Sequence, residues 1–137
     1  MKIIIAGSRS FTNFNLLNSV CDKMLSKQTV IEIVSGCANG ADKLGEEYAL
    51  KHNYKITRFP AYWKTYGKSA GYRRNEIMAN YADALIAFWD GTSTGTKHMI
   101  DLAISHGLKV KIEIFTKDLV KNHINKLLGY LNFQIQY

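Results

Sequence analysis

KIIIAGSR, at residues 2–9, holds four consecutive apolar residues that are followed at once by glycine, serine and arginine. Such a run is typical of a buried strand that ends in a tight turn. The same pattern returns in VIEIVSG at residues 30–36 and in ALIAFWDG at residues 84–91. We therefore predict that these runs are strands of one sheet, each followed by a turn at its carboxyl end.

Helical periodicity fills the intervals between the apolar runs. Parallel strands need a crossover between them, and strands buried on both faces read as continuous apolar runs. The chain therefore predicts an α/β class: a single Rossmann-like, three-layer domain with a mainly parallel five-stranded sheet and helices on both faces. The expected strands are Lys2–Ala6, Val30–Val34, Tyr54–Phe59, Ala84–Trp89 and Lys109–Phe115, and the expected helices are Phe14–Ser26, Ala41–His52, Gly71–Tyr81 and Thr96–Ser105.

We expect one domain, at residues 1–115, because 137 residues leave little room for two. Residues 116–137 read as a further helix, 118–128, and a short β-prone end, 133–137. Two roles stay open for this tail: packing on the same domain, or a contact in a homo-oligomer, a dimer or higher.

The composition is that of a folded domain, with 47% hydrophobic and 21% charged residues. The two cysteines, Cys21 and Cys37, lack metal-ligand spacing, which predicts reduced thiols, a cytoplasmic location and no metal site. No apolar run approaches the length that spans a bilayer, so we expect no membrane partner. The formal net charge of +7 favours anionic partners such as nucleotides or nucleic acid.

Three of the predicted strand ends carry small and hydroxyl residues. In an open parallel sheet, ligands bind beyond the carboxyl ends of the strands. Small residues let backbone N–H groups approach an anion, and hydroxyls donate to phosphate oxygens, so these loops predict a phosphate-bearing ligand. The alternative is that they are only tight turns. The candidate ligand-binding residues in these loops are Gly7, Ser8, Arg9, Ser35, Gly36, Asp42, Asp90, Gly91, Ser93, Gly95 and Thr96.

An aromatic and basic segment, expected to be a loop at residues 61–70, follows the third strand. Rings interleaved with cations suit stacking on a base and neutralising phosphate. Arg74 and Asn75 are expected in the first turn of the next helix, where a cation is unfavourable unless an anion lies nearby. The alternative is a solvated basic loop. The candidate binding residues here are Trp63, Tyr66, Lys68, Arg74 and Asn75.

Four residues have structural interpretations as well. Asp42 and Asp83 suit the fixing of their own loops through backbone hydrogen bonds. Cys37 is interpreted as a substitute for a small residue rather than as a nucleophile, and His98 as a partly buried structural histidine.

In combination, these motifs resemble the SLOG superfamily, and within it the YspA-like branch, over about residues 1–115. The superfamily takes its name from the Smf/DprA proteins and the Lonely Guy enzymes. The resemblance implies a Rossmann-like fold that binds nucleotides or NAD-derived molecules. Cys37, Tyr62 and Tyr72 depart from the usual Gly, Asp and Pro of the branch. The main matching pieces are AGSR at 6–9, SG at 35–36, ANGAD at 38–42, FPA at 59–61, YGK at 66–68, AG at 70–71, RN at 74–75, AD at 82–83, AFWDG at 87–91, GT at 95–96 and MI at 99–100.

The resemblance also implies that Gly95-Thr96 is the counterpart of the phosphate-binding Gly-Thr of the Lonely Guy enzymes. Those enzymes cleave the N-glycosidic bond of a nucleoside monophosphate with an Arg and a Glu. Here Met99 stands where the Glu is expected, and Asp101 is the nearest acid. The replacement speaks against phosphoribohydrolase activity.

The leading hypothesis is a protein that binds a nucleotide or an NAD/ADP-ribose-derived ligand as a sensor, carrier or sequestering protein, with no cofactor required. One alternative is an enzyme that hydrolyses an N-glycosidic bond, for which Arg74, Glu76 and Asp101 are the candidate catalytic residues. The other is a binder of single-stranded nucleic acid, which the net charge and the aromatic, basic segment favour.

Overall fold

The computed structural model describes residues 1–116. Its strands are β1 (Lys2–Gly7), β2 (Glu32–Ser35), β3 (Lys55–Arg58), β4 (Ala84–Trp89) and β5 (Lys109–Ile114); its helices are α1 (Phe14–Leu25), α2 (Ala41–His52), α3 (Trp63–Tyr66), the 3₁₀ turn η1 (Gly67–Ser69), α4 (Ala70–Tyr81) and α5 (Thr94–Ser105). All five strands are parallel and form one sheet in the order β3-β2-β1-β4-β5. The predicted α/β class and Rossmann-like architecture are confirmed.

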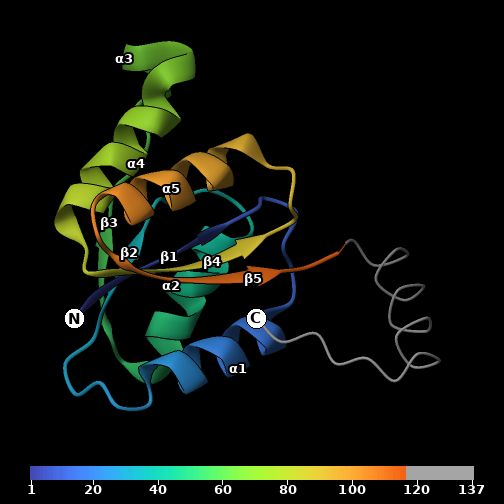
Figure 1. Cartoon of the computed structure of the whole chain (residues 1–137), viewed down its shortest axis with the longest axis vertical. Helices are drawn as coiled ribbons and strands as arrows, with labels where there is room; N and C mark the ends of the chain where they lie inside the picture. The colour runs from blue at the N-terminus through green and yellow to red at the C-terminus, as the bar shows by residue number, and fades with distance from the viewer. Residues whose placement is uncertain (117–137) are drawn as a thin grey trace.

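The sheet is covered on both faces. Figure 1 shows α1 and α2 on one face and α4 and α5 on the other. In β1, Ile3 and Ile5 pack with α1 and α2, whereas Ile4 and Ala6 pack with α4 and α5. The three isoleucines are fully buried, and burying such a side chain contributes ~1.5–3 kcal/mol. Burial on both faces explains why this strand reads as a continuous apolar run.

The strand order reverses beside β1. From β1 the chain proceeds to β2 and β3 on one side, and then returns to place β4 and β5 on the other side. Because the strands are parallel, the loops that follow β1, β2 and β4 emerge at one edge of the sheet, as the sequence predicts.

The first residues of two elements differ by two positions from the prediction. β2 begins at Glu32 rather than Val30, because the parallel register pairs Glu32 with Lys2 and leaves the Val30 side chain 76% exposed. α5 begins at Thr94 rather than Thr96, with Ser93 at the N-cap position. Residues 94 and 95 therefore belong to the first turn of this helix rather than to the loop before it.

The expectation of a loop at residues 61–70 is wrong, because α3 and η1 lie there. The Tyr62 carbonyl accepts hydrogen bonds from the N–H groups of Thr65 and Tyr66, which closes one helical turn. Gly67 then adopts a φ of +56°, and the Ser69 hydroxyl donates to the Tyr66 carbonyl at 3.0 Å. We call residues 62–69 the aromatic arm. Figure 1 shows the arm beyond the amino-terminal end of α4, away from the sheet.

The predicted tail lies outside the described residues from 117 onward, so its helix, its β-prone end and its role in a homo-oligomer stay predictions. Within residues 1–116, no helix combines the length and apolar character needed to cross a membrane. Over the same range, no group of three or more histidine, cysteine, aspartate and glutamate side chains has the arrangement of a metal site.

Candidate functional site

A cavity of about 510 Å³ opens at the carboxyl ends of β1 and β4, where the strand order reverses. Such a switch point is the usual ligand site of an open parallel sheet. We call it the main cavity. Its walls come from the loop after β1, the start of α2, the aromatic arm, α4 and the first turns of α5.

Ser8 ties the loop after β1 to the loop after β4. Its buried hydroxyl accepts from the Asp90 N–H at 3.1 Å and lies 2.9 Å from the Ser93 hydroxyl oxygen. The Ser8 N–H donates to the Phe88 carbonyl at 2.9 Å. These bonds fix one wall of the main cavity.

Asp90 holds the loop after β4 in shape. Its carboxylate accepts from the N–H groups of Thr92 and Ser93, at 2.9 and 2.7 Å, and from the Ser93 hydroxyl at 2.9 Å. Burial raises the pKa of Asp90, but these hydrogen bonds outweigh burial and lower the pKa to about 2. The carboxylate is therefore ionised at neutral pH, and Asp90 shapes the loop rather than binding an anion.

The two serine protons have acceptors inside the protein. Since the Ser93 hydroxyl donates to Asp90, the Ser8 hydroxyl is the donor in the bond between the two serines. Neither hydroxyl then has a proton left for a phosphate oxygen. The sequence-based argument that these hydroxyls donate to phosphate is not supported, and other groups must supply the donors.

The first turn of α5 supplies such donors. The first N–H groups of a helix have no acceptor within the helix, and the Ser93 side chain does not cap them. Thr94, Gly95 and Thr96 line the main cavity at this point. A Cβ built on Gly95 meets no atom within 4 Å, so the backbone here is open to a ligand. In residues 1–116 the Thr96 side chain makes no hydrogen bond.

Arg74 reaches the cavity from the second turn of α4. This position corrects the expected first turn, because α4 begins at Ala70. Its Nη1 donates to the Gly36 carbonyl and its Nε donates to Asn75 Oδ1 at 2.9 Å. Within the described residues, Nη2 donates to no protein acceptor. Arg74 therefore has donors left for a ligand.

The buried Asp42 carboxylate interacts electrostatically with Arg74 without forming a salt bridge to it. Its carboxylate accepts from the Ala38 N–H at 3.2 Å and from the Gly7 N–H, so it fixes its loop as predicted. Burial raises the pKa of Asp42 to about 6, against the opposing effect of Arg74 and of the two N–H donors. A Cβ on Gly36 would lie 2.7 Å from both Arg74 Nη1 and Asp42 Oδ2. Glycine at this position lets the pair approach.

With this geometry in view, the comparisons with known proteins identify the fold family. Residues 1–66, which hold the Gly-Ser-Arg turn after β1 and the loop after β2, match its model. The family is the YspA, cpYpsA-related SLOG family. The resemblance seen in the sequence motifs is confirmed.

Similar proteins come from a phage and from bacteria. The chain is 29% identical over 116 residues to the Gene 61 protein of Mycobacterium phage D29, covering 80% of this chain and 93% of the relative. DNA processing protein A (DprA) of Streptococcus pneumoniae has a similar structure, with a TM-score of 0.69 and 18% identity over 94% of this chain. The chain spans 56% of the length of that protein. DprA of Helicobacter pylori gives a TM-score of 0.65 and 21% identity over 98% of this chain and 74% of its own. These structural likenesses show the shared fold.

The fold brings most of the predicted binding residues to one place. Ser35, Tyr66, Asp90 and Gly91 do not line the main cavity, and Gly36 lines a smaller cavity beside it. The predicted residues that do line the main cavity are Gly7, Ser8, Arg9, Asp42, Trp63, Lys68, Arg74, Asn75, Ser93, Gly95 and Thr96.

Ser35 instead forms a hydrogen bond to Glu46 of α2, a residue that the sequence did not identify as part of the site. The Ser35 hydroxyl donates to Glu46 at 2.7 Å, and Arg58 Nε donates to the same carboxylate at 2.8 Å. Burial raises the pKa of Glu46, yet these two bonds outweigh it and leave the pKa below its ordinary value. The spacing along the chain could have identified Glu46, because it follows Asp42 by four residues on α2 and both therefore lie on the same buried face of this helix.

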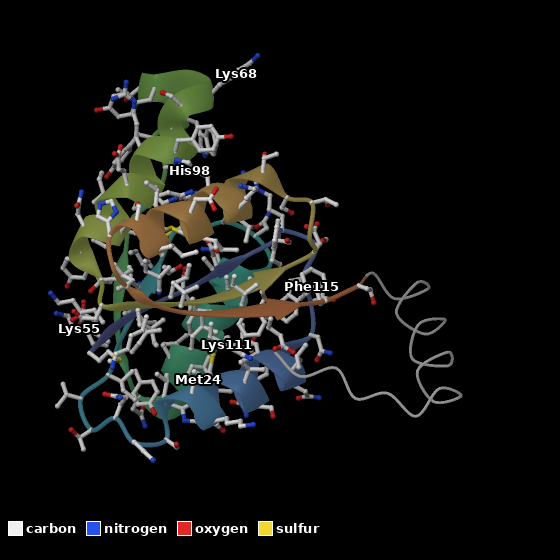
Figure 2. All side chains as sticks on the ribbon, viewed as in Figure 1. Met24, Lys55, Lys68, His98, Lys111 and Phe115 are labelled. Carbon is white, nitrogen blue, oxygen red and sulfur yellow. The ribbon has the colours of Figure 1, made fainter. Side chains whose placement is uncertain are left out.

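The aromatic arm divides between two surfaces. Trp63, 49% exposed, lines the main cavity, and the Arg9 guanidinium lies 6.0 Å from the centre of its ring. Tyr66 lines a different, small cavity of about 90 Å³, with Arg73 over its ring at 4.4 Å. Figure 2 shows Lys68 projecting from the end of the arm. Tyr72 also lines the main cavity, although the sequence analysis noted it only as a departure from the family.

Asn75 and His98 connect α4 to α5. The Asn75 amide donates to the Gly95 carbonyl at 3.3 Å and lies 3.1 Å from His98 Nδ1. Burial lowers the pKa of His98, which favours the neutral ring that accepts this bond. His98 lies between the two helices in Figure 2. It therefore has the structural role expected for it.

Two of the three catalytic candidates lie away from the cavity. Asp101 is exposed and paired with Lys97 at 2.7 Å, and Glu76 is exposed on α4. Neither lines the main cavity, whereas Met99 does, with 1% of its side chain exposed. Arg74 alone of the three reaches the cavity.

Proposed function

We propose that the SLOG domain binds a nucleotide or a nucleotide-derived ligand in the main cavity, through a phosphate at the first turn of α5. The observation that supports this proposal most is the match between charge and donors. Among the described residues that line the cavity, the cations are Arg9, Lys68 and Arg74, and the one acid, Asp42, is buried and interacts electrostatically with Arg74. A binding role as sensor, carrier or sequestering protein fits these residues, and none of them calls for a cofactor.

The phosphate would be held by groups whose donors are not used inside the protein. These are the first N–H groups of α5, the Thr96 hydroxyl and Arg74 Nη2. The helix dipole of α5 adds to the attraction at the same point. Trp63 and Tyr72, both about half exposed at the cavity wall, offer rings for a base.

Replacing Gly95 tests this proposal. We expect Gly95→Ala to raise the free energy of unfolding by up to ~1 kcal/mol, because alanine favours a helix and its Cβ meets no neighbour. The same Cβ occupies the approach to the first-turn N–H groups, so affinity for AMP should fall by about tenfold or more. Calorimetric titration and urea unfolding measure the two effects separately.

Thr96→Val is the companion variant. It keeps the shape and removes the hydroxyl donor, and losing a hydrogen bond to a charged group costs ~1.5–3 kcal/mol of binding. Unchanged AMP affinity in both variants would show that the first turn of α5 is not the phosphate site.

We expect little or no release of free base from nucleoside monophosphates. Cleaving the N-glycosidic bond builds positive charge on the ribose, and a carboxylate at the cavity would be needed to stabilise it. Met99 has neither charge nor a good acceptor, and Asp101 is held by Lys97 outside the cavity. Chromatography after incubation with the common nucleoside monophosphates measures this, and robust release that Asp101→Asn or Glu76→Gln abolishes would reverse the conclusion.

Single-stranded nucleic acid is the second candidate ligand, and the aromatic arm favours it. Tyr62, Trp63 and Tyr66 are exposed, and Lys64 and Lys68 lie among them. The structure of H. pylori DprA was described for its single-stranded DNA binding mode. If single-stranded nucleic acid binds to the aromatic arm, the affinity for oligo-dT should rise with the length of the oligonucleotide and fall steeply with salt concentration. Fluorescence anisotropy at several salt concentrations measures both, and affinity independent of length would exclude the arm as a binding track.

A further inference from the structure

The main cavity has a neighbour that the proposed function does not use. This second cavity, of about 290 Å³, lies over the loop after β2. Both cavities are lined by Arg9, Ala38, Trp63 and Arg74, so these residues form their common wall. The rest of the second cavity comes from Gly36, Cys37, Asn39, Pro60 and Ala61.

The common wall has the chemistry of a phosphate contact between two bases. Arg9 and Arg74 bring two cations to it, and Arg74 Nη2 has no acceptor among the described residues. The exposed indole of Trp63 belongs to both cavities, so it offers a stacking surface to an occupant of either. In addition, no carboxylate lines the second cavity among the residues described.

We propose that the ligand of this domain holds two nucleotide units joined through phosphate, one in each cavity, with the linking phosphate at Arg74 and Arg9. This inference rests on the proposed function and goes beyond it. A mononucleotide fills the main cavity alone and leaves the second cavity unused. Two units gain from being joined, because the second binds at the high effective concentration that the link imposes.

Titration calorimetry with four probes tests the inference. The matched pairs are dAMP against d(pApA), and AMP against NAD. We expect the joined ligand of at least one pair to bind the wild-type protein about tenfold or more tightly than its mononucleotide. Tighter binding of d(pApA) than of dAMP identifies the ligand as a strand of DNA. Tighter binding of NAD than of AMP identifies it as a pyrophosphate-linked dinucleotide.

Two tryptophan variants locate the effect. Asn39 is exposed and lines the second cavity but not the main cavity. In Asn39→Trp, the joined ligand of the preferred pair should therefore bind at most about twofold more tightly than its mononucleotide. Ser10 is exposed and lines the main cavity but not the second cavity, so Ser10→Trp should weaken the binding of both ligands of the pair. Circular dichroism confirms that each variant is folded.

The outcomes separate the two proposals. If mononucleotides bind and the joined ligands bind no more tightly, the two-cavity inference fails while the proposed function stands. Equal losses of both ligands in Asn39→Trp would also overturn it. If none of the four probes binds the wild-type protein, both proposals fail.

Discussion

Arg74→Ala is expected to destabilise the protein by ~1–3 kcal/mol at pH 8 and to abolish measurable nucleotide binding. The variant removes a nearby cation from a buried carboxylate and the donor from a carbonyl, and a buried polar group that loses its partner costs ~1–3 kcal/mol. Here the remaining charge is Asp42, which is 5% exposed. The Gly36 carbonyl also loses its donor. Urea unfolding at pH 8 measures the stability, and calorimetry at low temperature, where the variant is folded, measures the binding.

The effect of Arg74→Ala should shrink on acidification. The attraction between Arg74 and Asp42 exists only when the carboxyl is ionised, and burial raises the pKa of Asp42 to about 6. The cost is therefore full above that pH and falls below it. In the wild-type protein, the raised pKa means that the contribution of Asp42 to stability falls as the pH rises from about 4 to about 6, because the unfolded state releases its proton first.

Two further variants check the interpretation. Arg73→Ala is the matched control, since Arg73 is exposed and contacts only Ser69 and the Tyr66 ring by the interactions described; it should change stability by less than ~0.5 kcal/mol. Asp42→Asn in the Arg74→Ala background removes the unpaired charge and should recover at least half of the lost stability. A double variant no more stable than Arg74→Ala alone would contradict the explanation by the Asp42 charge.

Gly7→Ala is expected to cost ~3 kcal/mol or more of folding stability and, with it, ligand binding. A Cβ at this position would lie 2.1 Å from the Phe88 carbonyl oxygen and 2.9 Å from the Ala41 Cβ. The Phe88 oxygen is also the acceptor for Ser8 N–H, so relief of the clash would separate the ends of β1 and β4 and open the cavity wall. Thermal unfolding measures the loss.

Gly95→Ala is the control for this variant, because the same substitution at a helical glycine with no neighbour within 4 Å should not destabilise the fold. A Gly7→Ala protein as stable as the wild type would show that the strand ends tolerate movement and that the cavity wall is not rigid.

The sheet and the convergence of the three loops are predictable from the sequence, because they depend on local periodicity and on a general rule for parallel strands. Residues 3–6 are buried, with side chains on both faces of the sheet, so their apolar run is continuous and unambiguous. Once β1, β2 and β4 are parallel, their turns must share an edge.

The donors and partners within the site were not predictable in this way. Whether Ser8 and Ser93 offer protons to a ligand depends on the Asp90 carboxylate, and that depends on a turn geometry absent from the sequence pattern. The electrostatic interaction of Arg74 with Asp42 connects α4 to α2 across the edge of the sheet, so no local rule reveals it. The four-residue helix α3 has no buried residue, and hence no apolar periodicity marks it.

The central position of β1 has a consequence for how the protein is made. Its partner on one side, β4, comes late in the chain, and the Ser8–Ser93 contact joins residues 85 positions apart. During synthesis from the amino terminus, this strand, with its four consecutive buried apolar residues, therefore has one edge unpaired until β4 is made, which is the condition that favours wrong pairing between nascent chains. Closing so long a loop is slow compared with local helix formation. The main cavity thus forms only when β4 pairs with β1. Every chain that is able to bind a ligand therefore no longer exposes the edge of its first strand to aggregation.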